Sequence, residues 1–416
     1  MKHYICILTL VVLAQTLSGK VYRTEPISSR IKSLQVSLVD DWQGLPIIEL
    51  GGDKFVEIKF DEMSHEYKHL TYSIVHCDAD WTPSNLTPIE YIQGFQNMPV
   101  DDYLFSFATT TAYTNYRLVL PNEDVQFKVS GNYAVEVVDT ESRQVLLSAC
   151  FSVTESPNIP ISAQITTNTD IDFNRAHQQL SFSLNCNAYK ISSPQQELKV
   201  FVMQNNRRDN RVGSLQPTSI LNGIYTYQHN RQLIFEAGNE YRRFEITTTA
   251  YKPMGVDNIS FHSPYYHIDL MKDIFRAPRA YIYDEDHNGR YWVRSVQGTN
   301  HDTESDYFFV HFFLETPQPL LGRVYIQSEA FNNILDAGSE MQYSHEEGGY
   351  TKSTRLKQGA YNYMYLLQAG KNAPGSTAAI EGNFHQTRNE YTILVYHRPF
   401  GERFDRLIGS KTVMNQ

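Results

Sequence analysis

Short runs of alternating apolar and polar residues are the feature of this sequence that most constrains its fold. About eight such runs lie between Arg30 and Val153, for example residues 56–60. Turn signals such as Gly51-Gly52 separate them. A period of two places successive side chains on opposite faces of a strand, and regularly spaced turns are typical of antiparallel sandwiches. The pattern therefore predicts an immunoglobulin-like β-sandwich in this part of the chain.

The length and composition extend this prediction to the whole chain. At 416 residues the chain is too long for one sandwich and suits about three domains. The 28 Tyr and 22 Phe residues favour strands. We expect an all-β chain of about three tandem immunoglobulin-like sandwiches. Its expected parts are a signal peptide (1–19), an N-terminal β-sandwich domain (20–155), a second β-sandwich domain (156–271), a hairpin connector (272–305) and a C-terminal domain (306–416).

The first residues resemble a secretory leader. Lys2 supplies a positive start, and the apolar run from Tyr4 to Ala14 is too short to span a bilayer. We therefore expect an exported protein without a membrane-spanning segment. The formal net charge of −10, with no run of Lys or Arg, argues against nucleic acid or an anionic membrane as a partner.

The segment Thr71–Phe95 combines a strand, an acidic turn and a short helix. Adjacent strand residues point to opposite faces, so His76 and Cys77 are poorly placed to share one metal ion. We expect Asp78 and Asp80 to bond turn amides and Trp81 to pack as core.

Three cysteines follow the expected leader: Cys77, Cys150 and Cys186. In an oxidising compartment three thiols allow one bridge at most. A Cys77–Cys150 bridge within one domain and three buried free thiols both remain open.

Residues His65 to His69 match H-E-x-x-H, in which two His bind zinc and the Glu acts as base. The pattern requires a helix, but the strand runs ending at Phe60 and starting at Leu70 leave about nine residues, which suits a loop. A zinc-dependent hydrolase acting through His65, Glu66 and His69 is therefore the least favoured of the three functional interpretations considered for this sequence.

Asp284-x-Asp286-x-Asn288-Gly289 matches the first half of a calcium loop. The twelfth position is Ser295 instead of Glu, and Asn288-Gly289 is a hairpin-turn signal. A calcium site and a plain turn both remain open. The sequence contains no nucleophile elbow, phosphate-binding glycine loop or dinucleotide fingerprint, so we expect no catalytic residues, no cofactor and no small-molecule substrate.

The C-terminal segments Ala330–Ile334 and Leu356–Tyr363 resemble early-set immunoglobulin-like domains that bind α-glucans. The resemblance implies an early-set-like fold for residues 306–416. Those domains place a Trp after the paired Asn, where this chain has Ile334. A secreted carbohydrate-binding module is therefore the alternative function.

Several segments, taken in order, resemble the plug protein family of the type IX secretion system. They are residues 72–81 (YSIVHCDADW), 115–124 (NYRLVLPNED), 130–133 (SGNY), 356–363 (LKQGAYNY) and 380–384 (IEGNF). The resemblance covers nearly the whole chain after the leader. It implies a non-enzymatic periplasmic protein, docked peripherally under the outer-membrane translocon barrel, that seals the pore while no cargo-loaded partner is engaged.

Turn acids, amides and aromatics are the candidates for contacts with the rim of that barrel, because a reversible seal calls for a modest, polar interface. The candidates are Asp78, Asp80, Trp81, Asn122, Glu123, Asp124, Lys357 and Gln358. Each of them can equally serve turn chemistry alone.

Overall fold

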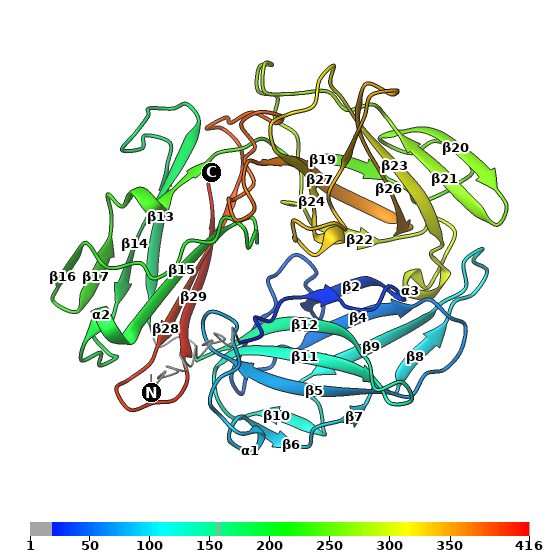
Figure 1. Ribbon diagram of the computed structural model, residues 1–416. Helices are drawn as coiled ribbons and strands as arrows, with labels where there is room; N and C mark the ends of the chain where they lie inside the picture. Colours follow the sequence, from blue (N-terminus) through cyan, green and yellow to red (C-terminus); the bar gives the residue numbers. More distant parts are fainter. Residues whose placement is uncertain (1–18, 156–158, 416) are drawn as a thin grey trace, which may run out of the picture.

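The computed structural model describes residues 19–155 and 159–415, and it consists of three β-sandwiches arranged around a common centre (Figure 1). Nearly all regular structure is strand, which confirms the all-β prediction. The expected leader lies outside the described residues, apart from Gly19. Within the described ranges, no helix has the length and apolar character needed to cross a membrane.

The first unit comprises residues 19–155. One sheet has the order β1-β12-β11-β5-β7 with β3 beside β12, and the facing sheet has the order β2-β4-β9-β8. The alternating apolar residues meet between the sheets, as the period of two predicts. The elements are β1 (Glu25–Pro26), β2 (Ile31–Leu38), β3 (Ile47–Glu49), β4 (Val56–Glu62), β5 (Leu70–Cys77), α1 (Pro88–Tyr91), β6 (Ile92–Gly94), β7 (Met98–Pro99), β8 (Asp102–Phe105), β9 (Thr114–Leu120), β10 (Val125–Phe127), β11 (Gly131–Asp139) and β12 (Val145–Thr154).

The second unit combines residues 159–237 with residues 388–415. Its sheets have the orders β13-β14-β17-β16, with β18 beside β14, and β15-β28-β29. Apolar residues of both segments share one core. The elements are β13 (Ile161–Thr166), β14 (His177–Asn185), α2 (Pro194–Glu197), β15 (Leu198–Gln204), β16 (Ser219–Leu221), β17 (Ile224–Tyr227), η1 (Arg231–Leu233), β18 (Ile234–Glu236), β28 (Glu390–His397) and β29 (Arg406–Met414).

The third unit comprises residues 238–387. Its sheets have the orders β19-β27-β22, with β24 beside β27, and β20-β21-β23-β26-β25. The elements are β19 (Arg242–Glu245), β20 (Val256–His262), β21 (Tyr265–Leu270), β22 (Tyr291–Val293), α3 (His301–Glu304), β23 (Tyr307–Glu315), β24 (Arg323–Gln327), η2 (Glu329–Phe331), β25 (Gln342–Ser344), β26 (Gly349–Lys357) and β27 (Gly359–Gln368).

The strand pairing runs across the boundaries that the sequence analysis placed at residues 271 and 305. β28 and β29, at the C-terminal end, pair with β15, and β19 pairs with β27. The expected connector hairpin does not form, because β22 pairs with β27 and residues 280–283 lie outside any strand. In that pairing Tyr291 stacks on Tyr361 at 5.2 Å within the core. We therefore propose the three units above as the domains.

Candidate functional site

The first and third units are joined through a buried ion pair. Lys357 Nζ, at the end of β26, lies 2.6 Å from Asp61 Oδ2 of β4 and donates to the carbonyl of Asp302 at 2.6 Å. The Tyr307 hydroxyl donates to the same Asp61 oxygen at 2.6 Å. Burial of the ammonium lowers the pKa of Lys357, and the Asp61 carboxylate offsets part of that shift.

The first and second units are joined around Arg398, which follows β28. Its guanidinium lies 2.7 Å from Asp78 of the first unit and 2.8 Å from Asp405 of its own unit. Asp405 also accepts the backbone N–H of Ala79 at 3.0 Å. This carboxylate is therefore held from both sides of the contact.

The second and third units are joined by two further pairs. Arg207 donates to the carbonyl of Gly375 at 2.7 Å, while Asp209 accepts the Gly375 N–H at 2.8 Å. Arg290 pairs with Glu390 at 3.0 Å. Each unit thus contacts both of the others, and the chain closes into one three-unit body (Figure 1).

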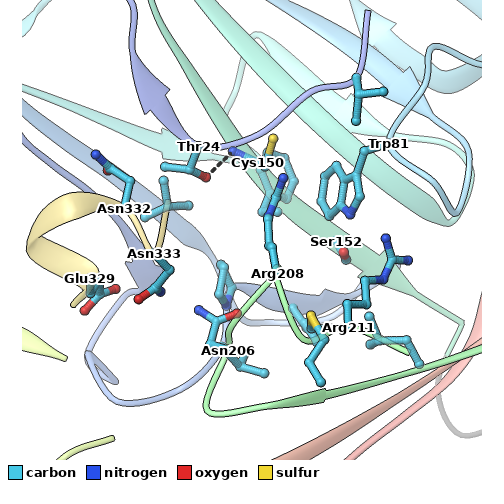
Figure 2. A pocket seen from close by; sticks show the side chains of 18 of the residues that line it. Thr24, Trp81, Cys150, Ser152, Asn206, Arg208, Arg211, Glu329, Asn332 and Asn333 are labelled. Atoms are coloured by element: carbon cyan, nitrogen blue, oxygen red, sulfur yellow. Dashed lines mark hydrogen bonds between the residues drawn. The ribbon is translucent and has the colours of Figure 1, made fainter. Parts of the chain in front are cut away.

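A cavity of about 270 Å³ lies where the three units meet; we call it the junction cavity (Figure 2). Its apolar wall includes Leu34, Val36, Ile47, Met203 and Leu394. Its polar lining includes Thr24, Asp80, Trp81, Ser152, Asn206, Arg208, Arg211, Glu329, Asn332 and Asn333.

Two arginines project into the junction cavity from the segment after β15. Arg208 donates to the carbonyl of Tyr22 at 3.0 Å and lies 4.9 Å from the centre of the Trp81 ring. Arg211 donates to the carbonyl of Ala79 at 2.6 Å and stacks on Phe201 at 3.7 Å. Burial lowers the pKa of Arg211.

Two carboxyl groups also line the junction cavity. Asp80 is turned towards Thr82, whose N–H it accepts at 3.1 Å. Glu329 of η2 is enclosed by the protein, which raises its pKa to about 7. Arg290 acts against that shift by favouring the charged carboxylate.

The eight predicted interface residues do not form one patch. Lys357 and Gln358 are buried between the first and third units, where the Gln358 side chain accepts the N–H of Asp306 at 2.8 Å. Asp78 lies in the contact with the second unit, and Trp81 lines the junction cavity. The other four lie in two turns. Asp80 lies in the turn after β5 and is exposed. Asn122, Glu123 and Asp124 lie in the turn between β9 and β10, where Asn122 accepts the N–H of Val125 at 2.9 Å and the two acids are exposed.

The sequence analysis did not single out Arg208 and Arg211 as site residues. They lie in the segment from Arg207 to Arg211, whose polar residues are typical of a turn. The doubled arginine beside a strand end was the available signal, but its function depends on units that meet only in three dimensions.

The H-E-x-x-H segment lies in the loop between β4 and β5, as the spacing predicted. His65 Nε2 lies 3.1 Å from the carbonyl of Ser106, and Glu66 pairs with Lys68 at 2.7 Å. A loop does not present two histidines at helical spacing, so the zinc-protease geometry is absent here. Within the described residues, no group of three or more His, Cys, Asp or Glu is arranged to hold a metal.

The Asp284–Gly289 segment forms a turn against β19. Asp284 pairs with Arg243, and Asp286 accepts the N–H groups of Tyr241 and Asn288. Burial raises the pKa of Asp286 to about 7. These contacts are those of a structural turn.

The features compared with sugar-binding domains face inwards. Tyr363 is buried and its hydroxyl donates to Asp273 at 2.7 Å. Phe331 packs against the third unit's core. Tyr363 therefore cannot stack on a sugar.

The cysteines Cys77, Cys150 and Cys186 are buried free thiols. Cys77 lies opposite Asn132 on β11, and Cys150 lies on β12, on the far side of β11. Two strand spacings of about 4.8 Å each separate the two Cα atoms by about 9.6 Å, which exceeds the Cα separation of about 4.4–6.8 Å that a disulfide spans. The bridge that the sequence left open is therefore excluded by the sheet order.

The first unit matches a known protein family, and the whole fold is similar to a solved structure. Residues 31–155 match the family described as "Type 9 secretion system plug protein 1st domain". The whole fold is similar to a crystal structure of a hypothetical protein from Parabacteroides merdae ATCC 43184, with 50% identity and a TM-score of 0.93. That match covers 95% of this chain and 100% of the other. No curated protein matches the chain.

The match covers most of the first unit, including the segments YSIVHCDADW, NYRLVLPNED and SGNY. The first unit of the chain belongs to the family of type 9 secretion system plug protein first domains. Membership supports a plug-like role related to type IX secretion.

Proposed function

We propose that this protein is a non-enzymatic plug that docks on the periplasmic mouth of the outer-membrane type IX translocon. It would seal that mouth while no cargo-loaded partner is engaged. The family match of the first unit carries the proposal. A body closed by contacts between all three pairs of units also suits the task, because a seal must keep its outline when its partner is absent.

The proposed docking face lies at one end of the first and second units. Ile89 on α1, Phe95 after β6 and Phe400 after β28 are 77%, 77% and 99% exposed. Arg403 pairs with Glu90, which holds the loop of Phe400 against α1. Exposed apolar side chains in one region mark interaction surfaces on exported proteins as on others.

The acidic turn predicted as a rim contact borders this face. β6 pairs with β10, and Gly94 lies opposite Val125, next to the exposed Glu123 and Asp124. An apolar centre with a polar border is the usual anatomy of a protein interface. We therefore assign Glu123 and Asp124 to the rim of the docking face.

Affinity purification tests the partner. The tagged protein, purified from cells in which transport is blocked, should recover the outer-membrane translocon barrel. Absence of the barrel from such a purification would count decisively against the proposal.

A matched pair of variants tests the face. Phe95→Ser combined with Phe400→Ser should reduce barrel recovery at least about tenfold, because burying each ring contributes about 1.5–3 kcal/mol. Leu321→Ser, at a residue of the third unit that is 95% exposed, should leave recovery unchanged. Equal loss of barrel recovery in both variants would refute the assignment of the docking face, while the identity of the partner would still stand.

A further inference from the structure

We infer that the junction cavity is a binding site for a small amphiphilic monoanion, a carboxylate carrying a short aliphatic chain. This inference does not rest on the proposed plugging role. The cavity combines two guanidinium groups, an apolar wall and a volume of about 270 Å³, close to the lower end of the roughly 300–1,000 Å³ typical of ligand pockets.

The two guanidinium groups keep hydrogen-bonding capacity to spare. Each has five N–H donors. For Arg208 the partners within the described residues are the Tyr22 carbonyl and the Cys150 thiol, with Trp81 against its plane. For Arg211 the hydrogen-bonding partner is the Ala79 carbonyl, and its buried Nε has none among the described atoms. Neither arginine forms an ion pair with a described carboxylate within 4.0 Å.

This arrangement differs from that of the buried Arg207 and the half-buried Arg242. Arg207 is paired with Asp209, and Arg242 is paired with both Asp273 and Glu381. Enclosing guanidinium groups without a carboxylate is unfavourable, and a bidentate carboxylate is the geometry that their planar fork fits best. Two guanidinium groups suited to an anion therefore lie where the three units meet.

The charges that face the cavity favour one negative charge on the ligand. Arg208 and Arg211 contribute two positive charges, and Asp80 contributes one negative charge. Glu329 is partly protonated near neutral pH. The remaining excess is about one positive charge or less, which matches a monoanion better than a dianion.

The walls determine the rest of the ligand. Leu34, Val36 and Ile47 of the first unit face Met203 and Leu394 of the second across the cavity. Figure 2 shows Arg208 rising through the middle of this space, with Trp81 and Arg211 to one side and Asn332 and Asn333 to the other. An aliphatic chain would cover the apolar wall while its carboxylate meets the arginines.

Decanoate, added below its micellar concentration to the chain from Lys20 onward, is the probe. The chain has three Trp residues, and Trp81 is the one found among the residues that line the cavity. A change in its fluorescence therefore reports that the cavity is occupied. Calorimetry gives the affinity. Decanoate should bind at least tenfold more tightly than decyltrimethylammonium, and acetate should not saturate.

Arg208→Met and Arg211→Met should each weaken decanoate binding about tenfold, because each removes a charge-assisted pair. Arg231→Met, at an exposed arginine on η1 away from the cavity, should have no effect. If a methionine variant fails to fold, Arg211→Lys keeps the charge but loses the fork, and should weaken binding measurably.

Trp81→Phe should abolish the fluorescence change while heat of binding persists. The inference is overturned by equal binding of the cationic probe, by tighter binding of decyl phosphate, by unchanged affinity in the arginine variants, or by no saturable binding of decanoate.

Discussion

Replacing Lys357 with Met tests how the first and third units are held together. The substitution keeps the length of the side chain but removes the ammonium that faces Asp61. Both side chains are almost wholly enclosed, with 2% and 0% of their surfaces exposed. The Asp61 carboxylate would keep the Tyr307 hydroxyl and the Asn115 amide as donors, yet it would lose its cation.

Removing one partner of a buried ion pair costs about 3–5 kcal/mol, because the other charge stays buried without compensation. An unfolding entropy of about 2.1 cal/mol/K per residue gives roughly 0.8 kcal/mol/K for a body of this size. If the three units unfold together, Lys357→Met should therefore lower Tm by about 4–6 °C. Calorimetry measures Tm and shows whether one transition or several occur.

Two controls make the test specific. Lys352 lies on the same strand, and its ammonium donates to the carbonyl of Ala337 at 3.0 Å. It forms no ion pair with a carboxylate among the described residues, so Lys352→Met should cost less than about 1 kcal/mol. The double variant Asp61→Asn with Lys357→Met removes both charges and should recover much of the loss. Equal Tm shifts in Lys357→Met and Lys352→Met, or strictly additive effects in the double variant, would refute the reasoning.

Three further predictions concern a buried histidine, two glycines and the buried thiols. Burial lowers the pKa of His76 to about 4, below its unfolded value of about 6.5. The neutral imidazole therefore contributes its full stability above pH 6.5, and the free energy of unfolding should fall by about 3 kcal/mol towards pH 4. Denaturant midpoints should fall more steeply between pH 6.5 and 4 for the wild type than for His76→Gln. Gly131→Ala should destabilise the protein by more than about 2 kcal/mol, because φ is +136° and a Cβ would lie 2.4 Å from His76 Nε2. Gly51→Ala is the control: φ is +71° but the space around it is open, so it should cost about 1 kcal/mol. Denaturant titration compares the two variants. Cys77, Cys150 and Cys186 should resist iodoacetamide in the native protein and should all react in guanidinium chloride without reductant. A protein mass two units below that of the reduced chain would reveal a disulfide and contradict the sheet order.

Local patterns predicted the elements well. Alternation at residues 56–60 corresponds to β4, and the strand at the start of the Thr71–Phe95 segment corresponds to β5. The short spacing between them predicted the loop that contains His65 and His69. These features depend on periodicity and turn residues, which act within a few positions of the chain.

Long-range pairings were beyond the reach of such patterns. Lys357 resembles an exposed charge at a strand end, but its partner Asp61 lies 296 positions earlier. The strands β28 and β29 have the same alternating character as their neighbours in sequence, yet they complete the sheet of β15 in the second unit. Strand alternation specifies which face of a strand is apolar, and it leaves open which sheet receives that face.

The return of the C-terminal strands also determines how the body can move. The chain leaves the second unit after residue 237, builds the third unit, and returns at residue 388 to finish the second. Two connections therefore link these units, in addition to the Arg290–Glu390 pair. Separating any one contact would leave the body closed through the other two. Engagement and release of a partner would then proceed as movements of the whole body, with the exposed loops that carry Phe95 and Phe400 as the parts free to adapt.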